Sequence, residues 1–358
     1  MELIPGLPND VARECLVRIP YEQVRFAASI CKGWKKEIES PEFRDRRKAA
    51  GLSGVLVILA QARPSLIWEF DSPKHVASLT YRLSVFQPLS GQWSTLPPIP
   101  GFTAGLPMFC ALAAAGSELV VMGGTDPVMW DALNSVYIYN FLSLKWRPGT
   151  DMPGGIRTSF SCASDGNRMV YVAGGCGGQR ESLKSALVYD VKMDKWVAMP
   201  DMARERAACK GTFRCGRFQV IGGYPTELQG RFEKSVEVFD PVTWCWQPVQ
   251  ENVLEVSTYP GTCVDGNNTS KSLYMCMNGN VIARNSSGWR DVAKLPSKWF
   301  RPVHVARWHE KLTVVGSDGL RNSEYMAHTL DLNTYSWTRI EIPETFSGHV
   351  MGGCCLEI

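Results

Sequence analysis

The sequence predicts a mainly β protein, a six-bladed β-propeller preceded by a small all-α module. Three observations lead to this fold class. Six tryptophans recur at intervals of roughly 50 residues, the length of one propeller blade. Three β-rich apolar strings, each upstream of such a tryptophan, end in a pair of glycines. The first 50 residues show neither feature and carry apolar side chains at helical spacing instead.

The composition is that of a folded protein. The chain has 358 residues, of which 45% are hydrophobic, too many for a disordered chain. Its 38 basic and 35 acidic residues leave no excess of charge that would favour nucleic acid. Its longest run without polar residues, at 108–115, is too short to cross a membrane, and its first residues lack the apolar segment of an export signal. We therefore expect no nucleic-acid or membrane partner and a cytoplasmic or nuclear location.

The twelve cysteines lie scattered in apolar strings such as FSCAS and GGCCLE. Disulfides are rare in proteins that are not exported, so we expect reduced and mostly buried thiols.

Residues 1–48 are predicted to form three short helices. Asn9 and Asp10 can cap the first helix, residues 21–40 carry apolar side chains at helical spacing, and Ser40–Pro41 opens a basic third helix. A module of this size has a marginal core and usually needs a partner to cover its apolar surface. This points to an interaction domain.

The blades are predicted from a recurring strand, turn and strand. A large apolar residue stands seven positions before five of the six tryptophans, and the next residue is Gln, Asn or Asp, which can open a turn. The apolar residues are Phe86, Tyr139, Tyr189, Phe239 and Leu330, the turn residues are Gln87, Asn140, Asp190, Asp240 and Asp331, and the tryptophans are Trp93, Trp146, Trp196, Trp246, Trp289 and Trp337. We interpret these tryptophans as packing between blades.

The glycine pairs are Gly123–Gly124, Gly174–Gly175 and Gly222–Gly223. The order of glycine pair, aromatic strand, polar turn and tryptophan resembles the kelch repeat. Three units match this pattern closely, and the first, fifth and sixth depart from it in their glycines.

The propeller is predicted to span 53–358 and to be closed by the C-terminal strand. The first unit lacks a counterpart of the innermost strand, and the final string GHVMGGCCLEI is apolar enough to supply it. Such closure would remove exposed sheet edges.

The N-terminal module resembles an F-box, whose pattern is matched in order over 37 residues. The matching residues are Leu7, Pro8, Asp10, Leu16, Ile19, Pro20, Ser29, Ile30, Cys31, Lys32, Trp34 and Phe43. An F-box followed by kelch repeats resembles the F-box/kelch-repeat family, which is abundant in plants.

This resemblance implies a substrate receptor of a Skp–cullin–F-box ubiquitin ligase. The F-box would dock a Skp-type adaptor, and through it a cullin–RING ligase, while the propeller holds a protein for ubiquitination and proteasomal degradation. Similar plant proteins target phenylpropanoid-pathway enzymes such as phenylalanine ammonia-lyase, or cytokinin-response regulators. The residues expected to bind the adaptor are Leu7, Pro8, Leu16, Ile19, Pro20, Val24, Cys31 and Trp34. The alternative for Leu7, Leu16, Ile19 and Trp34 is the interior of the helical module, and about half of these four are expected to face inward.

Substrate is expected on the propeller face that gathers the loops after each second strand and before each first strand. Aromatic and arginine side chains dominate interface energies. The candidates are Trp130, Arg180, Tyr224, Arg231, Trp299 and Arg321. Arg157, Arg206 and Arg301 share one register before the first strand of three units and are interpreted mainly as arginines that hold loops in place.

The sequence contains no recognisable catalytic or metal-binding motif, so we predict no enzymatic activity, no metal and no cofactor. The kelch specifier proteins of plants bind iron through Glu-x-x-x-Asp-x-x-x-His, and only Asp71 and His75 match here, with Ile67 in place of the glutamate. The alternative function is a ligand-binding or catalytic propeller with a vestigial F-box.

Overall fold

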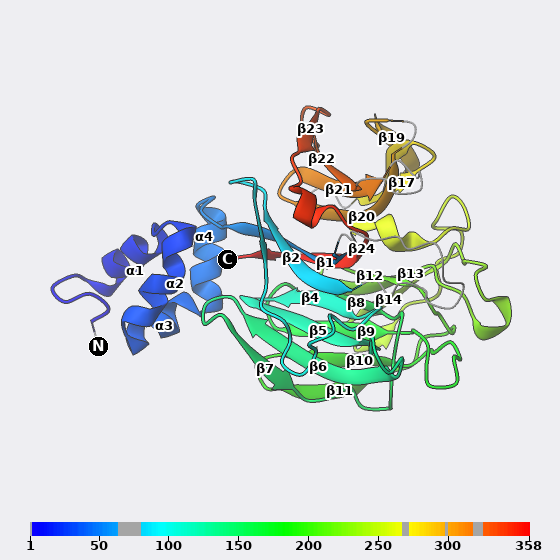
Figure 1. The fold of residues 1–358 in the computed structure, drawn as a ribbon, viewed down its shortest axis with the longest axis horizontal. Coiled ribbons are helices and arrows are strands. Elements are labelled where there is room, and N and C mark those ends of the chain that lie inside the picture. Colours follow the sequence, from blue (N-terminus) through cyan, green and yellow to red (C-terminus); the bar gives the residue numbers. More distant parts are fainter. Residues whose placement is uncertain (1, 64–79, 267–271, 298–299, 318–324) are drawn as a thin grey trace, which may run out of the picture.

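The computed structural model describes residues 2–63, 80–266, 272–297, 300–317 and 325–358. In this part of the chain, four helices lie beside one end of a ring of six four-stranded antiparallel sheets (Figure 1). The predicted fold class, a β-propeller preceded by an α-helical module, is confirmed.

The helical module contains four helices where the sequence predicted three. They are α1 (Asn9–Val17), α2 (Tyr21–Ile30), α3 (Lys32–Ile38) and α4 (Pro41–Ala49). The single helix expected over 21–40 is interrupted at Cys31, whose backbone is extended, with φ −154° and ψ 163°. The Cys31 sulfur then accepts a hydrogen bond from the Trp34 amide at 3.4 Å and caps the next helix. Helical spacing continues across this residue, so periodicity alone could not reveal the break.

Each blade contributes four strands, numbered along the chain. The first blade contains β24 (Val350–Glu357), β1 (Val55–Ala62), β2 (Tyr81–Gln87) and β3 (Gln92–Thr95), and the second β4 (Ala111–Ala115), β5 (Glu118–Thr125), β6 (Ala132–Asn140) and β7 (Lys145–Gly149). The third contains β8 (Ser161–Ser164), β9 (Met169–Ala173), β10 (Ala186–Asp190) and β11 (Lys195–Met199), and the fourth β12 (Lys210–Arg214), β13 (Arg217–Ile221), β14 (Val236–Asp240) and β15 (Cys245–Trp246). The fifth contains β16 (Val264–Asp265), β17 (Leu273–Met277), β18 (Asn280–Asn285) and β19 (Gly288–Lys294), and the sixth β20 (Arg301–Trp308), β21 (Lys311–Ser317), β22 (Tyr325–Asp331) and β23 (Trp337–Ile340).

The two ends of the propeller meet in the first blade. Its innermost strand is β24, which pairs antiparallel with β1, so that Val55 lies opposite Glu357 and Val57 lies opposite Cys355. All residues of β1 are buried, and the strand is paired along both edges, with β24 on one side and β2 on the other. The C-terminal strand therefore covers the edge of β1 that would otherwise be unpaired.

The blade tryptophans tie each blade to the one before it. Each indole Nε1 donates a hydrogen bond to a carbonyl of the preceding blade or the loop that leaves it, and each ring is about half-buried. The donor and acceptor pairs are Trp93–Glu341 (3.1 Å), Trp146–Pro97 (2.9 Å), Trp196–Thr150 (2.7 Å), Trp246–Pro200 (2.7 Å), Trp289–Val253 (2.8 Å) and Trp337–Lys294 (2.8 Å). The predicted role between blades is confirmed, and the pair Trp93–Glu341 joins the first blade to the last.

Four of the five predicted turn residues fix their turns through the side chain, and Gln87 does not. Asn140, Asp190, Asp240 and Asp331 each accept a hydrogen bond through the side-chain oxygen from a backbone amide two residues later. These bonds fix the hairpin that returns the chain to the tryptophan strand.

The glycine pairs allow neighbouring blades to approach closely. Gly174 has φ +66°, and a Cβ there would lie 2.3 Å from the carbonyl oxygen of Arg206, which leads into the next blade. The adjacent Gly175 amide donates to that same carbonyl at 2.7 Å. Any larger residue at Gly174 would separate the two blades.

The hydrophobic core is divided among the gaps between blades, and one part of it continues into the helices. The cluster between the first and second blades contains Leu56 and Leu119 together with Leu16, Val24 and Phe43 of the helical module. The helices therefore share a core with the propeller instead of being joined to it by a linker.

Among the described residues, no helix has both the length and the apolar character needed to cross a membrane. All twelve cysteines lie within these residues, and each is an unpaired thiol. Four of them, Cys15, Cys31, Cys215 and Cys245, are exposed, and the others are buried or half-buried.

Candidate functional site

The helical module presents apolar side chains to solvent on two helices. Phe26 and Ile30 of α2 are 70% and 53% exposed and lie one helical turn apart, on the same face. Leu7 and Val11, just before and within the first turn of α1, are also exposed. Exposed apolar side chains that lie next to one another on a helix are unfavourable in water and often mark a binding surface. We call these four residues the exposed apolar helix surface.

Six of the eight predicted adaptor-binding residues are at least partly accessible. Leu7, Pro8, Pro20 and Cys31 are exposed, while Ile19 and Trp34 are half-buried. The Trp34 indole donates to the Leu3 carbonyl at 2.6 Å and so holds the segment that precedes α1.

Leu16 and Val24 require a correction. Their side chains are 1% and 2% exposed and belong to the core shared with Ile38 and Phe43. They therefore support the module from inside and present no surface to an adaptor.

Val11 and Phe26 were missed by the sequence reasoning, and Ile30 was noted only as a family match. The sequence could have revealed them, because they are large apolar residues outside the periodic apolar stripe of each helix.

The loop between β5 and β6 forms an exposed apolar tip on the face of the propeller that points away from the helical module. Val128, Met129 and Trp130 are 62%, 70% and 62% exposed. The Asp126 carboxylate accepts hydrogen bonds from the Val128 and Met129 amides, both at 2.8 Å, which fixes the turn. Trp130 adopts a positive φ of 61°, an unusual conformation for a bulky residue. The predicted candidate Trp130 is thus held outward by its loop.

The other described candidates lie in the next two loops of the same face. Arg180 and Arg231 are exposed, and Tyr224 is half-buried against Phe232, with 5.4 Å between ring centroids. The Ser182 amide donates to the Thr226 hydroxyl at 2.9 Å, which joins the two loops. Trp299 and Arg321 lie outside the described residues.

Arg157 and Arg206 support these loops from below. Arg157 is buried and donates to the Gly174 carbonyl at 2.6 Å and to the Ser185 hydroxyl at 2.7 Å. Arg206 repeats both contacts one blade later, at Gly222 and Ser235.

Burial lowers the Arg157 pKa to about 10, still well above neutral pH. The interpretation as loop-holding arginines is confirmed for Arg157 and Arg206, whereas Arg301, the third member of that register, is exposed.

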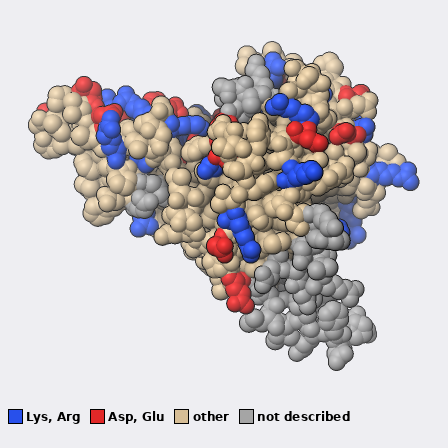
Figure 2. All heavy atoms as spheres, turned by 90° about the horizontal axis from the view of Figure 1, so that it is seen from above, with Lys and Arg blue, Asp and Glu red and all other residues tan. Residues whose placement is uncertain are grey.

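Charges of both signs are distributed over the molecule. On the face seen in Figure 2, lysine and arginine lie interspersed with aspartate and glutamate, and no broad region carries one sign alone. In the described part of the chain, no group of three His, Cys, Asp or Glu side chains is placed to hold a metal ion. Asp71 and His75 lie outside it.

Two family models match the chain in agreement with this geometry. The kelch motif matches residues 108–153 and 156–203, which cover the second and third blades, and the F-box domain matches residues 4–46, which cover the helical module. An F-box attached to a kelch propeller defines a class of protein, the substrate adaptors of Skp–cullin–F-box ubiquitin ligases.

Full-length relatives identify the family. The chain is 45% identical to F-box/kelch-repeat protein At1g80440 and 43% identical to F-box/kelch-repeat protein At1g15670, both of Arabidopsis thaliana and both over 100% of each chain. F-box/kelch-repeat protein At2g44130 of the same plant is 33% identical over 77% of this chain and 72% of its own. The chain belongs to the family of F-box/kelch-repeat proteins.

Proposed function

We propose that this protein is the substrate-recognition subunit of a Skp–cullin–F-box ligase, acting in the cytoplasm or nucleus. The exposed apolar helix surface docks the Skp-type adaptor, and the loop face of the propeller binds the protein to be ubiquitinated. The observation that carries this proposal is that the helical module and the propeller loops that follow the second strands lie at opposite ends of the molecule (Figure 1). We assign no catalytic step to the chain itself, because ubiquitin transfer would be performed by the assembled ligase.

The orientation of the two surfaces follows from where α4 contacts the propeller. Arg44 donates to the Asn167 side chain in the turn between β8 and β9 and lies against Gly116 in the turn between β4 and β5. These turns connect first to second strands, whereas Trp130 and Arg180 lie in loops that connect second to third strands. The two kinds of connection occupy opposite faces of a propeller, so the substrate face points away from the F-box.

Several contacts hold this orientation fixed. Buried Arg47 donates to the carbonyls of Val17 (2.8 Å), Ile19 (2.7 Å) and Leu52 (2.6 Å), which ties α4 to the rest of the module and to the start of the propeller. Lys48 forms an ion pair with Glu357 of β24 at 2.8 Å. A rigid connection would hold a bound substrate at a set distance from the ligase.

The adaptor contact is supported by burial energetics. Covering a large apolar side chain contributes roughly 1.5–3 kcal/mol, and Phe26 and Ile30 are exposed enough to gain most of this on docking. No such gain is open to Leu16 or Val24, which are already buried.

The adaptor contact is tested by co-purification of the full chain with a Skp-type protein. The double variant Phe26→Asp and Ile30→Asp should lose the adaptor, because each hot-spot loss of about 2 kcal/mol weakens binding roughly thirtyfold. Val242→Asp is the matched control, since Val242 is 92% exposed on the propeller. Adaptor binding by the double variant equal to that of the control, with both proteins folded, would overturn the proposal.

The substrate is proposed from the family resemblance and from the chemistry of the loop face. Exposed Trp130 and the arginines Arg180 and Arg231 suit a folded protein with apolar and acidic surface groups. A phenylpropanoid-pathway enzyme such as phenylalanine ammonia-lyase is the first substrate to test, and a cytokinin-response regulator is the second.

The double variant Phe26→Asp and Ile30→Asp also serves as a substrate trap, because it should retain a substrate without delivering it for degradation. Phenylalanine ammonia-lyase should be enriched with this bait, and adding Trp130→Ala should reduce the enrichment. Recovery of the enzyme at the level of an unrelated bait would reject it as the substrate. Recovery unchanged by Trp130→Ala, Arg180→Ala and Arg231→Ala together would reject the loop face.

A further inference from the structure

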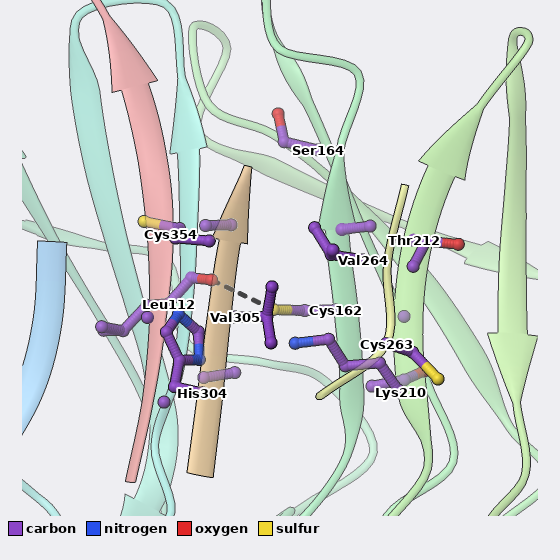
Figure 3. Close-up of a pocket in the computed structure, with 18 of the residues that line it drawn as sticks. Leu112, Cys162, Ser164, Lys210, Thr212, Cys263, Val264, His304, Val305 and Cys354 are labelled. Carbon is purple, nitrogen blue, oxygen red and sulfur yellow. Dashed lines mark hydrogen bonds between the residues drawn. The ribbon is translucent and has the colours of Figure 1, made fainter. Parts of the chain in front are cut away.

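A cavity of about 570 Å³ lies along the axis of the ring, between the innermost strands of the six blades (Figure 3). Its lining is of mixed chemistry. The strands β4 and β24 contribute only apolar, glycine and cysteine residues, such as Leu112 and Cys354. His304 of β20, the strand next to β24, lies beside these residues, and Lys210 of β12 and Asp265 of β16 lie across the cavity from Leu112 (Figure 3).

One buried polar atom of the cavity lining, Nε2 of His304, has no hydrogen-bond partner among the described residues. His304 is 3% exposed. Thr212 of β12 and Asp265 of β16 also line the cavity, and their side chains interact with each other. Buried polar groups in folded proteins are almost always paired with protein, water or ligand. The unpaired His304 nitrogen therefore indicates a hydrogen bond with a group from outside the chain.

Lys210 lies across the cavity from His304 and supplies a positive charge. Its side chain extends from β12 into the cavity, toward the side where His304 lies (Figure 3). Within the described part of the chain, its ammonium group has neither an ion pair nor a side-chain hydrogen bond. Lys210 and His304 occupy the same register in their blades, opposite Ile221 and Val315, the residues just before the second-strand glycines.

The field of Lys210 reaches across the cavity. Its charge lowers the pKa of the Cys162 thiol, although burial is stronger and the net effect raises that pKa to about 11. It also acts with burial to lower the pKa of His304 to about 3, so that this imidazole is neutral at physiological pH. Asp265, the acidic group of the lining, is also faced by Arg214 and Arg307. The charged part of the cavity lining is therefore net positive.

We propose that the channel binds a small organic monocarboxylate with an apolar body. The carboxylate accepts hydrogen bonds from the Lys210 ammonium and the His304 imidazole, and the body lies against Leu112, Cys162 and the residues of β24. One lysine matches one carboxylate, and the apolar wall favours a body that a simple inorganic anion lacks. The cavity is large enough for a ligand of one or two rings.

The test uses 2-naphthoate as the probe and the neutral isostere 2-naphthamide as its control, titrated calorimetrically into the full-length protein. Naphthoate should bind saturably with a Kd of about 1 mM or tighter, and naphthamide at least about tenfold more weakly. Lys210→Met should weaken naphthoate binding about tenfold, the effect of losing one charge-assisted hydrogen bond, while Lys210→Arg should retain most of it. Lys195→Met, at an exposed position of β11, should change nothing.

Three outcomes would overturn the proposal. The first is no saturable binding of naphthoate, in which case water alone would hydrogen-bond to Lys210 and His304. The second is equal binding of naphthoate and naphthamide, or of naphthoate by wild type and Lys210→Met. The third is displacement of naphthoate by equimolar inorganic phosphate, which would indicate a general anion site. If Lys210→Met does not fold, the comparison of Lys210→Arg with His304→Gln replaces it, and only His304→Gln should weaken binding.

Discussion

Arg206 and Glu237, whose side chains are both 0% exposed, form an ion pair in the fourth blade with 2.9 Å between Nε and Oε1. The Glu237 carboxylate also accepts a hydrogen bond from the Ala203 amide at 2.7 Å, and Arg206 donates to the carbonyl of Gly222 at 2.6 Å. This pair fixes the loop that enters the blade against the loop that follows its second strand. The third blade has Arg157 in the same register but Leu187 in place of the glutamate, so its arginine is held by carbonyl and hydroxyl groups alone.

Glu237→Gln should destabilise the propeller strongly, because it removes the fully buried counter-charge of the Arg206 guanidinium and leaves the more distant, partly exposed Glu233 at 3.6 Å. Removing one partner of a buried pair typically costs about 3–5 kcal/mol. The measurement is the midpoint of chemical unfolding. Asp240→Asn, which breaks the more exposed pair with Arg217, is the control and should change the midpoint far less, because exposed ion pairs contribute little. Similar losses in the two variants would show that the buried pair is not a principal support of the blade.

Trp196→Ala should destabilise the ring, whereas Trp130→Ala should not. Trp196 is half-buried, stacks on Tyr189 with 4.7 Å between ring centroids and donates a hydrogen bond to the Thr150 carbonyl. Its replacement should lower the free energy of unfolding by about 2–3 kcal/mol, less than the loss of a fully buried ring. Trp130 is exposed, and its loss should stay within about 0.5 kcal/mol. Melting temperatures check both values. A large loss for Trp130→Ala would mean that its loop is part of the core.

Leu356→Asp should prevent stable closure of the ring. Leu356 is 1% exposed on β24, opposite Leu56, and belongs to the core shared with the helices. A buried, unpaired carboxylate there costs several kcal/mol and should free the strand, exposing the edge of β1 to aggregation. Size-exclusion chromatography and thermal unfolding report both effects. Glu357→Gln, one residue away, loses only the surface pair with Lys48 and should stay monodisperse. A monodisperse Leu356→Asp protein with an unchanged melting temperature would contradict closure by β24.

The channel residues His304 and Asp265 should have opposite effects on stability as the pH falls. Burial lowers the His304 pKa from 6.5 to about 3, so the unfolded chain binds the extra proton and stability is lost as the pH falls below about 6.5. Burial raises the Asp265 pKa from 3.8 to about 6, so the folded chain binds the extra proton between these values and gains stability as the pH falls through them.

These two effects largely cancel between pH 6 and pH 4 in the wild-type protein. Asp265→Asn should therefore lose stability more steeply than wild type over this window, by up to about 1.4 kcal/mol per pH unit, and His304→Gln less steeply. Unfolding midpoints at pH 7, 6 and 5 provide the measurement, and differences from wild type remove the contribution of other carboxylates. Parallel curves for the three proteins would show that neither group titrates as its burial implies.

The repeat could be predicted from the sequence because each of its elements is local. The geometry of one hairpin sets Asp190 and Trp196 six residues apart. The glycine pair is required because the backbone of the next blade approaches closely there. The same local pattern identified the F-box, although it joined α2 and α3, because the extended backbone at Cys31 does not disturb helical spacing.

The sequence by itself thus determined the blades, their order and the helical module. Only the tertiary structure decided which face of each helix is buried, because the helices share a core with the first two blades. That shared core covers Leu16 and Val24 and leaves Phe26 and Ile30 in solvent. The channel is likewise a product of ring closure, since Lys210 and His304 are 94 residues apart and face each other only when β24 completes the first blade.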